Sequence, residues 1–269
     1  MFQFSLSFII WIGVSSLETP EADYNSVMTT EQTSEHIRIV PRGPYRVEGG
    51  IRLFVYSQEM SPQGEPLSWI FEREITPEKH PYLLCRCGKS KTFPFCDHTH
   101  IEIDFDGQET ATTDKPLKVD VVMRANDGLT IRKFHPLCMS SGFCVRVSGA
   151  IEDFSEFSDD PEDHEIAIKM VEDCPSGSLT YSLDRDGEDI EINYPMQIAM
   201  TREGVENELV NGPYWVMGYA PIERSDQVPF LRRNRVTLCA CGNSRQKPLC
   251  DGMHRMLAEY ELSKRKHNR

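Results

Sequence analysis

One pattern of cysteines and a histidine occurs twice in the chain and limits its fold more than any other feature. Residues 85–100 read CRCGKSKTFPFCDHTH and residues 239–254 read CACGNSRQKPLCDGMH, so both follow the spacing C-x-C-x8-C-x3-H. Two cysteines at i and i+2 of an extended segment point to one face, and a cysteine and a histidine at i and i+4 share a face of a helical turn. Each copy thus predicts a metal site with four ligands. The ligands are Cys85, Cys87, Cys96 and His100 in the first copy, and Cys239, Cys241, Cys250 and His254 in the second.

The residues next to these ligands also suit a metal site. Gly88 and Gly242 follow the two C-x-C pairs, where the backbone must turn tightly. Asp97 and Asp251 come directly after the third cysteine of each copy, at the start of an expected short helix. A carboxylate there accepts backbone amides that the helix leaves free, and it can also orient the histidine ligand from outside the cage. The two aspartates are therefore either structural caps or groups that tune the histidine.

The repeat extends beyond the cysteines. The segment GPYRVEG at residues 43–49 recurs as GPYWVMG at residues 212–218, and each is followed by β-type residues and then by a cysteine motif. The first copy is 15 residues longer between the glycine and the first cysteine. We expect this insertion within residues 60–81, whose prolines and glycine suit a long loop or a hairpin.

A segment of different character, residues 106–195, lies between the two copies. Asn126-Asp127-Gly128 predicts a hairpin turn. Asp160 followed by Pro161 predicts the start of a helix, because aspartate is a good N-cap and proline suits the first helical position. This helix is expected to end before Cys174-Pro175. Strands are expected at 119–123, 129–131 and 178–182.

The same segment holds the remaining three cysteines: Cys138, Cys144 and Cys174. A bacterial ferredoxin has the run C-x2-C-x2-C followed by a distant C-P. Here the middle position of the run is Ser141, which leaves C-x5-C and the distant Cys174-Pro175. The spacing predicts a third cluster site that lacks one cysteine. The alternative is three buried cysteines that bind nothing.

The cysteine count and the charge narrow the classes of protein. Nine cysteines divide into three groups of three, and the odd number argues against a complete set of intrachain disulfides. A formal net charge of −13 has the wrong sign for binding nucleic acid over a broad face. Residues 152–165 hold eight aspartates and glutamates. They predict either a solvated acidic face or a docking surface for a basic redox partner.

Both cysteine motifs resemble the CDGSH iron–sulfur domain of the mitoNEET family. The second copy matches it as Cys250-Asp251-Gly252-Met253-His254, whereas the first has His98 where the family has glycine. The resemblance implies a [2Fe-2S] cluster held by three cysteines and one histidine in each motif. It also implies a small β-rich fold in which two units pair about a two-fold axis, and here one chain supplies both units. A structural zinc site with the same four ligands is the alternative.

The middle segment resembles a divergent single-cluster ferredoxin. This resemblance implies a [3Fe-4S] cluster on Cys138, Cys144 and Cys174, or a [4Fe-4S] cluster with a fourth ligand that is not cysteine. The fold class is then α+β. The chain is expected to begin with an N-terminal segment at 1–37 that is disordered or mis-annotated. A first CDGSH module at 38–105, a ferredoxin-like domain at 106–195 and a second CDGSH module at 196–262 follow, and a basic tail at 263–269 ends the chain as given.

The function expected from these sites is electron transfer or cluster transfer. A redox-sensing or relay subunit of an oxidoreductase complex and a structural zinc module are the alternatives. No motif for independent catalysis is present, so the chain is not expected to be an enzyme. The expected partners are a redox protein or flavin reductase, or an apo-protein that accepts a cluster, with no nucleic acid.

A cytoplasmic location is expected because the thiols must stay reduced. The apolar run at residues 2–14 is too short to span a bilayer, but it suits a signal peptide or a short anchor. The alternative is a gene start placed too early, with Met28 as the true start. No membrane association is expected unless residues 2–14 are retained.

Overall fold

The computed structural model describes residues 35–115 and 117–267. The expectations for the apolar run at 2–14 and for Met28 lie outside these residues, as does almost all of the N-terminal segment 1–37. Within the described part, every helix is too short or too polar to cross a membrane. The description below concerns the compact unit that begins at Thr33.

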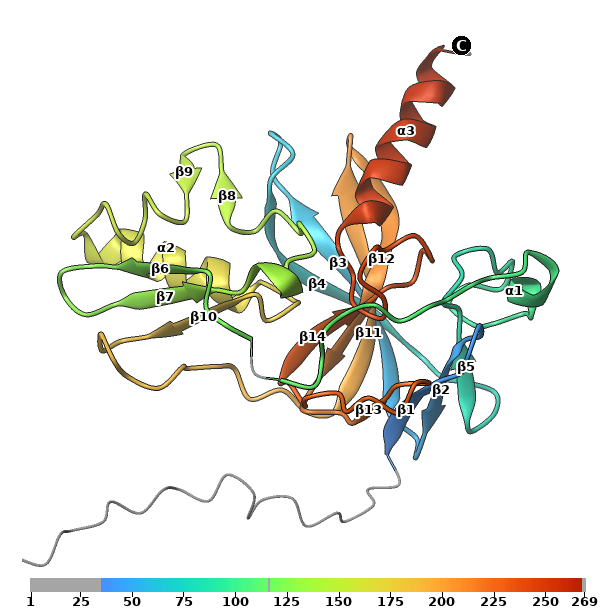
Figure 1. Ribbon diagram of the computed structural model, residues 1–269. Helices are drawn as coiled ribbons and strands as arrows, with labels where there is room; N and C mark the ends of the chain where they lie inside the picture. Colours follow the sequence, from blue (N-terminus) through green and yellow to red (C-terminus); the bar gives the residue numbers. More distant parts are fainter. Residues whose placement is uncertain (1–34, 116, 268–269) are drawn as a thin grey trace, which may run out of the picture. The chain divides into compact units, whose positions relative to one another are not determined.

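Strands from the two copies of the repeat build two sheets. The first sheet has the order β13-β1-β2-β5 and the second has the order β14-β12-β11-β3-β4 (Figure 1). The strands of the first sheet are β1 (His36–Ile39), β2 (Tyr45–Glu48), β5 (Tyr82–Leu84) and β13 (Ile222–Glu223). Those of the second are β3 (Arg52–Met60), β4 (Pro66–Ile75), β11 (Gln197–Val205), β12 (Glu208–Met217) and β14 (Arg235–Leu238).

The two copies exchange a strand. β3 of the first copy pairs in parallel with β11 of the second, and β13 of the second copy pairs in parallel with β1 of the first. The sequence repeat makes β2 equivalent to β12, and each pairs with the strand that precedes it in an antiparallel ladder. Each sheet is therefore completed by the other copy, as an intrachain pseudo-dimer requires.

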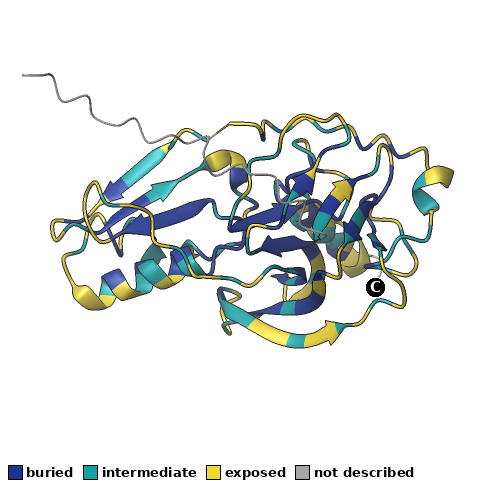
Figure 2. Ribbon diagram, turned by 90° about the horizontal axis from the view of Figure 1, so that it is seen from below, coloured by how far each residue is buried: buried dark blue, intermediate teal, exposed yellow. Residues whose placement is uncertain are grey.

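The exchange produces one shared hydrophobic core. Ile37 and Leu53 of the first copy are buried in the same cluster as Tyr214 and Leu238 of the second. The buried residues follow the strands of both sheets (Figure 2). Since burial of apolar side chains is the main favourable term in folding, neither copy keeps its core without the other.

The range 60–81, where a long loop or a hairpin was expected, holds the turn and the second strand of a hairpin whose first strand, β3, already begins at Arg52. β3 and β4 pair antiparallel, and Ser61 donates its backbone N–H to the Glu65 carbonyl across the turn. The hairpin also reaches the middle region, because Nε1 of Trp69 donates a hydrogen bond to the Asp173 carbonyl at 2.9 Å. It thus connects the CDGSH-like repeat to the segment between the copies.

The middle region is a three-stranded sheet covered by one long helix. The sheet has the order β10-β7-β6, and α2 (Pro161–Glu172) packs on it through Ala167, Met170 and Val171. Asp160 caps α2 by accepting a hydrogen bond from the Glu162 amide at 2.9 Å, which confirms the expected helix start. The expected strands are also present, with ends shifted by up to two residues. They are β6 (Val121–Arg124), β7 (Thr130–Lys133) and β10 (Leu179–Ser182), accompanied by η1 (His135–Leu137), β8 (Val145–Arg146) and β9 (Gly149–Ala150).

A helix follows the last cysteine of each copy. In the first copy it is α1 (Thr99–Glu102), a single turn, and in the second it is α3 (Met253–His267). Residues 263–267, expected within a basic tail, form the last part of α3. Lys264, Arg265 and Lys266 in this final turn suit the negative end of the helix dipole.

Candidate metal centres

The first centre lies between the end of β5 and α1. The Sγ atoms of Cys85 and Cys87 are 3.8 Å apart, and Sγ of Cys96 lies 3.3 Å from Nδ1 of His100. Hydrogen bonds join the two segments, since Cys85 donates its amide to the Pro94 carbonyl and Cys96 to the Leu83 carbonyl. Cys85 and Cys87 are buried, whereas Cys96 and His100 are partly exposed.

The second centre repeats this geometry between β14 and α3. The Sγ atoms of Cys239 and Cys241 are 3.7 Å apart, and Sγ of Cys250 lies 3.4 Å from Nδ1 of His254. The equivalent backbone hydrogen bonds are present, from Cys239 to Pro248 and from Cys250 to Thr237. This centre is more enclosed than the first, because Cys250 and His254 are only 2% and 5% exposed.

In each centre the four ligands form two pairs rather than one tight group. Two ligands of a single tetrahedral metal at about 2.3 Å lie about 3.8 Å apart, and the C-x-C pairs match that spacing. Among the described residues, however, the one set of three or more ligating atoms within 4.8 Å of one another is Cys96, His98 and His100. Within each centre, the close contacts are thus the C-x-C pair and the cysteine–histidine pair.

The thiols of the two centres differ in acidity: a hydrogen bond from Cys241, with backbone amides, lowers the pKa of Cys239 to about 6, whereas burial makes other thiols weaker acids. Burial raises the pKa of Cys96 and raises that of Cys250 strongly, because the thiolate form is desolvated. Burial also raises the pKa of Cys87, to about 11. Thiolates are the metal-binding form, so metal binding at these centres displaces protons.

Asp97 and Asp251 hold the loops through backbone amides. Asp97 accepts hydrogen bonds from Lys91 at 2.8 Å and from Thr99 at 3.0 Å. Asp251 does the same with the amides of Arg245 and Met253, at 3.0 and 3.1 Å. The amide of Lys91 is the main reason that the pKa of Asp97 lies well below its usual value. These contacts favour the cap interpretation of the two aspartates.

The two centres are joined by reciprocal contacts across the pseudo-dimer. The hydroxyl of Tyr45 donates to the Cys239 carbonyl at 2.9 Å, and that of Tyr214 donates to the Cys85 carbonyl at 2.9 Å. The rings of these tyrosines meet edge to face, with centroids 5.9 Å apart. Each repeat tyrosine therefore supports the cysteine loop of the other copy.

The glycines after the C-x-C pairs make the same exchange. Gly88 and Gly242 both have a positive φ, of 70° and 77°. A Cβ at Gly242 would lie 2.6 Å from the Cys87 carbonyl oxygen, and a Cβ at Gly88 would overlap the Cys241 carbonyl. Glycine is required at both positions by the close approach of the two loops as well as by the turn.

The third centre gathers the cysteines of the middle region. Cys138, Cys144 and Cys174 line one small cavity together with Ser141, which is 7% exposed. Cys138 follows η1, and Cys174 follows α2 closely. Burial raises the pKa of Cys144, and the neighbouring Cys174 and Cys138 add to this effect. The structure thus brings together the three cysteines that the sequence assigned to one site.

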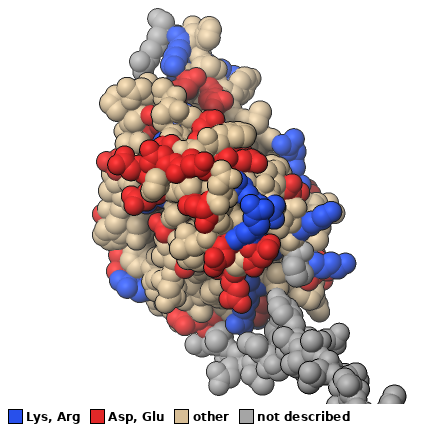
Figure 3. Space-filling view, turned by 90° about the vertical axis from the view of Figure 1, so that its left-hand side faces the viewer, with Lys and Arg blue, Asp and Glu red and all other residues tan. Residues whose placement is uncertain are grey.

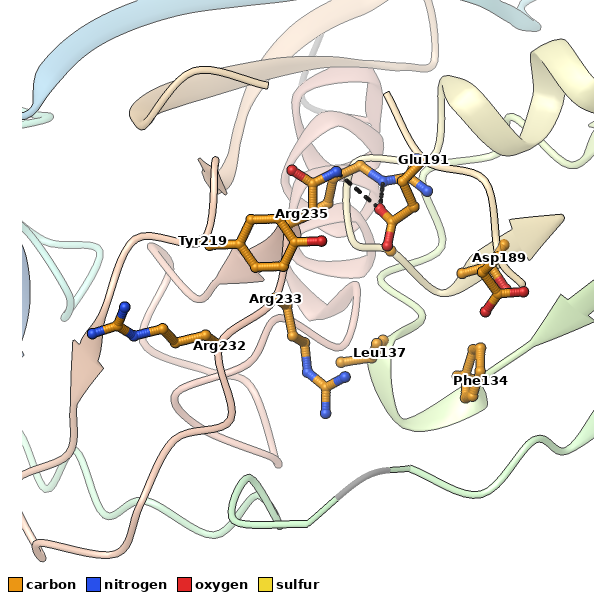
Figure 4. Close-up of a pocket in the computed structure, with 11 residues that line it drawn as sticks. Phe134, Leu137, Asp189, Glu191, Tyr219, Arg232, Arg233 and Arg235 are labelled. Atoms are coloured by element: carbon orange, nitrogen blue, oxygen red, sulfur yellow. Dashed lines mark hydrogen bonds and ion pairs between the residues drawn. The ribbon is translucent and has the colours of Figure 1, made fainter. Parts of the chain in front are cut away.

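A buried arginine supports this centre from β14. Arg235 donates hydrogen bonds to the carbonyls of Val171, Cys174 and Leu179 at 2.9, 2.9 and 3.0 Å, and its Nε donates to Glu191 at 3.0 Å. Figure 4 shows Arg235 turned to Glu191 in the lining of a pocket. The side chains of Arg232 and Arg233, which also line this pocket, extend away from Glu191. Sequence spacing carried no signal of this role, because the contacts join residues about 60 positions apart.

Comparison with protein families agrees with the three centres. A model described as an iron-binding zinc finger of CDGSH type matches residues 42–101 and 211–255. A model described as a divergent 4Fe-4S mono-cluster matches residues 125–184. This is a protein with two CDGSH domains around a mono-cluster domain. Comparisons with curated proteins and with solved structures found no match. The family assignment confirms both resemblances and the α+β fold class.

The second CDGSH domain touches the mono-cluster domain through its motif. Gly252 has φ +83°, and a Cβ there would lie 2.8 Å from the Met139 carbonyl oxygen and 3.2 Å from Ser140 Cβ. Cys250 is two residues before Gly252, and Cys138 is one residue before Met139. The equivalent His98 of the first CDGSH domain keeps the left-handed backbone, with φ 68°, but its side chain is exposed. The departure from glycine at His98 is therefore accommodated where the loop faces solvent.

A buried carboxylate beside the second centre was not found from the sequence. Oε1 of Glu203 on β11 lies 3.3 Å from Nε2 of His254, and the Glu203 side chain is fully buried. Glu203 is 51 residues before its histidine, and a glutamate in a strand has no spacing that marks it as a partner of a ligand. The sequence QIAMTREGV of this strand gave no signal either, because Glu203 stands beside Thr201 and Arg202 and reads as part of a polar stretch.

Acidic side chains gather on the side of the mono-cluster domain. Figure 3, which views the molecule from that side, shows many aspartates and glutamates and fewer basic groups. Within residues 152–165, most of the carboxylates are exposed. Several of them have local roles, since Asp160 caps α2 and Asp153 accepts the Ala150 amide at 2.8 Å. Both interpretations of this stretch, a solvated face and a docking surface, are compatible with these contacts.

Proposed function

We propose that this iron–sulfur protein is an electron carrier. Each CDGSH domain binds a [2Fe-2S] cluster through three cysteines and one histidine. The mono-cluster domain binds a [3Fe-4S] or [4Fe-4S] cluster through Cys138, Cys144 and Cys174. The separation of each CDGSH ligand set into two pairs supports the two-iron cluster, and the common cavity of the three remaining cysteines supports the larger one. Such clusters supply one-electron chemistry when bound.

The observation that carries this proposal is the contact between Gly252 and the Met139–Ser140 backbone. It brings the Cys250 loop of the second CDGSH domain against the Cys138 loop of the mono-cluster domain. The reciprocal approach of Gly88 and Gly242 brings the two CDGSH centres together in the same way. The three centres therefore form a series of neighbours, with the second CDGSH centre in the middle, and an electron that enters at one end has a route to the other.

The protein's own residues support this role in three ways. Cys85, Cys239 and Cys250 are buried, so water is kept from one side of each CDGSH centre. Tyr45 and Tyr214 fix the two cysteine loops relative to each other. The single histidine of each CDGSH centre replaces an anionic ligand by a neutral one, which raises the reduction potential, as it does in Rieske centres.

The partners follow from the charge and the redox chemistry. We propose that the exposed acidic face of the mono-cluster domain receives a basic redox protein or flavin reductase, and that the protein works in the cytoplasm, where thiols stay reduced. The protein then acts with its partner and has no catalytic reaction of its own. Cluster transfer to an apo-protein is a second candidate, favoured by the partial exposure of Cys96 and His100 in the first centre.

Iron and sulfide analysis of anaerobically prepared protein tests the proposal. We expect about seven or eight irons per chain for three clusters, with matching acid-labile sulfide. The variant Cys144→Ser should remove the signal of the mono-cluster centre in electron paramagnetic resonance (EPR) spectra and leave both [2Fe-2S] signals. Rapid-mixing reduction by a flavin reductase should then become slow for the [2Fe-2S] centres. Zinc without labile sulfide would refute the proposal, and unchanged reduction kinetics in Cys144→Ser would refute the relay.

A further inference from the structure

We propose that Glu203 is a positioning residue for His254 and that it makes the two [2Fe-2S] centres unequal. Through its contact with the histidine, Glu203 lowers the reduction potential of the second centre and slows the loss of its cluster. This inference rests on the proposed function, because it requires a cluster at the second centre. Glu203 lies outside both CDGSH motifs, so the inference adds a residue beyond the motifs that sets the potential and stability of that centre.

The two nitrogens of His254 have different neighbours. Nδ1 faces the cage and lies 3.4 Å from Sγ of Cys250, while Nε2 lies 3.3 Å from Oε1 of Glu203. Both atoms are buried, and within the described residues neither has a hydrogen-bonding partner, so they face each other as a close pair without a formed hydrogen bond. A carboxylate that accepts the proton on Nε2 leaves Nδ1 unprotonated and free to bind a metal. The carboxylate thus selects the tautomer that the site requires.

The position of the Glu203 carboxylate is itself fixed. Its other oxygen, Oε2, forms an ion pair with Nη1 of Arg255 at 2.9 Å, and Nη2 of Arg255 donates to the Gly204 carbonyl at 3.0 Å. On the adjacent strand, a Cβ at Gly212 would lie 2.5 Å from Oε1 of Glu203. The repeat glycine therefore leaves the space that the carboxylate fills. A buried charge held in this way does not turn away from the histidine to reach water.

The first centre lacks this arrangement. His100 has the same contact of Nδ1 with a cysteine, Cys96, at 3.3 Å. Its ring lies beside the exposed His98, with centroids 5.8 Å apart, and within the described residues it forms no ion pair with a carboxylate like that between His254 and Glu203. The two centres therefore have the same ligands but different surroundings for the histidine.

This difference has a definite sign. A carboxylate that accepts the outer N–H of a histidine ligand makes that ligand more basic, which strengthens its bond to the metal. It also places negative charge near the centre, which disfavours the addition of an electron. We therefore expect the second centre to have the lower potential and the slower cluster loss. An electron that reaches the second centre from the mono-cluster domain then passes favourably to the first.

The test compares Glu203→Gln with Glu206→Gln. The first variant keeps the shape of the side chain and removes its charge, and the second removes a carboxylate that lies three residues further along and pairs with Lys266 on the surface. Potentials are measured by redox titration with EPR detection, and cluster loss is measured as the rate of iron transfer to a chelator. The variant His100→Cys changes the spectrum of the first centre and so assigns the two signals.

In Glu203→Gln we expect the potential of the second centre to rise and that of the first to stay at its wild-type value. Loss of the second cluster should become about 10- to 100-fold faster, the usual range for removing a partner of a metal-binding histidine. Glu206→Gln should leave all of these values unchanged. Far-ultraviolet circular dichroism shows whether Glu203→Gln is folded. If it is not, Glu203→Asp, which keeps the charge and withdraws it from the histidine, should change the same centre in the same direction.

Unchanged potentials and loss rates in folded Glu203→Gln would overturn the inference, and so would equal shifts at both centres. In either case the wild-type clusters would remain, and the proposed electron transfer would stand. Wild-type protein without a [2Fe-2S] signal would overturn both the proposed function and this inference. The two failures are thus distinguished by the spectrum of the wild-type protein alone.

Discussion

Replacing Gly242 by alanine should damage the centre to which Gly242 does not belong. Gly242 is part of the second CDGSH motif, but a Cβ at this position would lie 2.6 Å from the carbonyl oxygen of Cys87, a ligand of the first. Backbone atoms on both sides leave no flexible side chain to move aside. We therefore expect the first cysteine loop to shift and the first [2Fe-2S] signal to be lost or altered together with the second.

The size of the effect follows from two terms. Gly242 has φ +77°, and an alanine in the left-handed region costs about 1–2 kcal/mol. The overlap with Cys87 adds about 1–3 kcal/mol, the usual cost of overpacking a filled site. Gly64→Ala is the matched control, because Gly64 has φ +85° and nothing within 4 Å of its Cβ position. The change in the unfolded chain is the same in both variants, so their difference isolates the contact between the two loops.

Denaturant unfolding of both variants, followed by circular dichroism, measures this difference, and EPR spectra report the two centres. We expect Gly242→Ala to be less stable than Gly64→Ala by about 1–3 kcal/mol. Equal losses of stability in the two variants, with both [2Fe-2S] signals intact in Gly242→Ala, would show that the two loops do not depend on reciprocal packing.

Three further predictions concern other contacts. Gly252→His gives the second motif the residue of the first and should separate the mono-cluster domain and weaken its EPR signal, because a Cβ there would lie 2.8 Å from a backbone oxygen. The reverse exchange, His98→Gly, is its control: it relieves a φ of 68° and should be neutral or stabilising by up to about 1 kcal/mol in denaturant unfolding. Arg235→Lys should cost about 1–3 kcal/mol of unfolding free energy and lower the iron content, because lysine cannot donate to all of the carbonyls that the guanidinium holds. Burial lowers the pKa of His164, but hydrogen bonds to the Ser158 carbonyl and Asp127 outweigh burial and raise this pKa overall. Unfolding measured between about pH 5 and pH 8 should therefore show that the stabilisation by His164 is full below about pH 6.5 and falls as the pH rises through the raised pKa. His164→Gln should remove this contribution.

Each of these predictions has a clear contrary result. An intact mono-cluster signal in Gly252→His would mean that the two domains do not depend on this close contact. Wild-type stability and iron content in Arg235→Lys would show that the carbonyls at the end of α2 do not need the several donors of the guanidinium. Stability that does not change with pH in the wild type, or that still falls in His164→Gln, would remove His164 as the responsible group.

The ligands and the local elements could be predicted because short spacings control them. Cysteines two residues apart on an extended segment share a face whatever the rest of the chain does. Cys250 and His254 also come close, at 3.4 Å, but α3 begins only at Met253, so a turn through Gly252 makes this contact and the expected helical turn does not. The start of α2 followed from Asp160 and Pro161, whose effects are also local. The hairpin insertion could be found because the repeat showed where the first copy is longer.

The relations between the centres could not be predicted in this way. The exchange of β3 and β13 between sheets, the partnership of Glu203 with His254 and the burial of Arg235 all join residues far apart in the chain. Spacing carries no information about such contacts, because they form only when the shared core closes and excludes water. Local geometry was thus sufficient to pick out the candidate ligands, whereas the folding of distant strands onto one another sets which centres are neighbours and gives the histidines of the two CDGSH centres different surroundings.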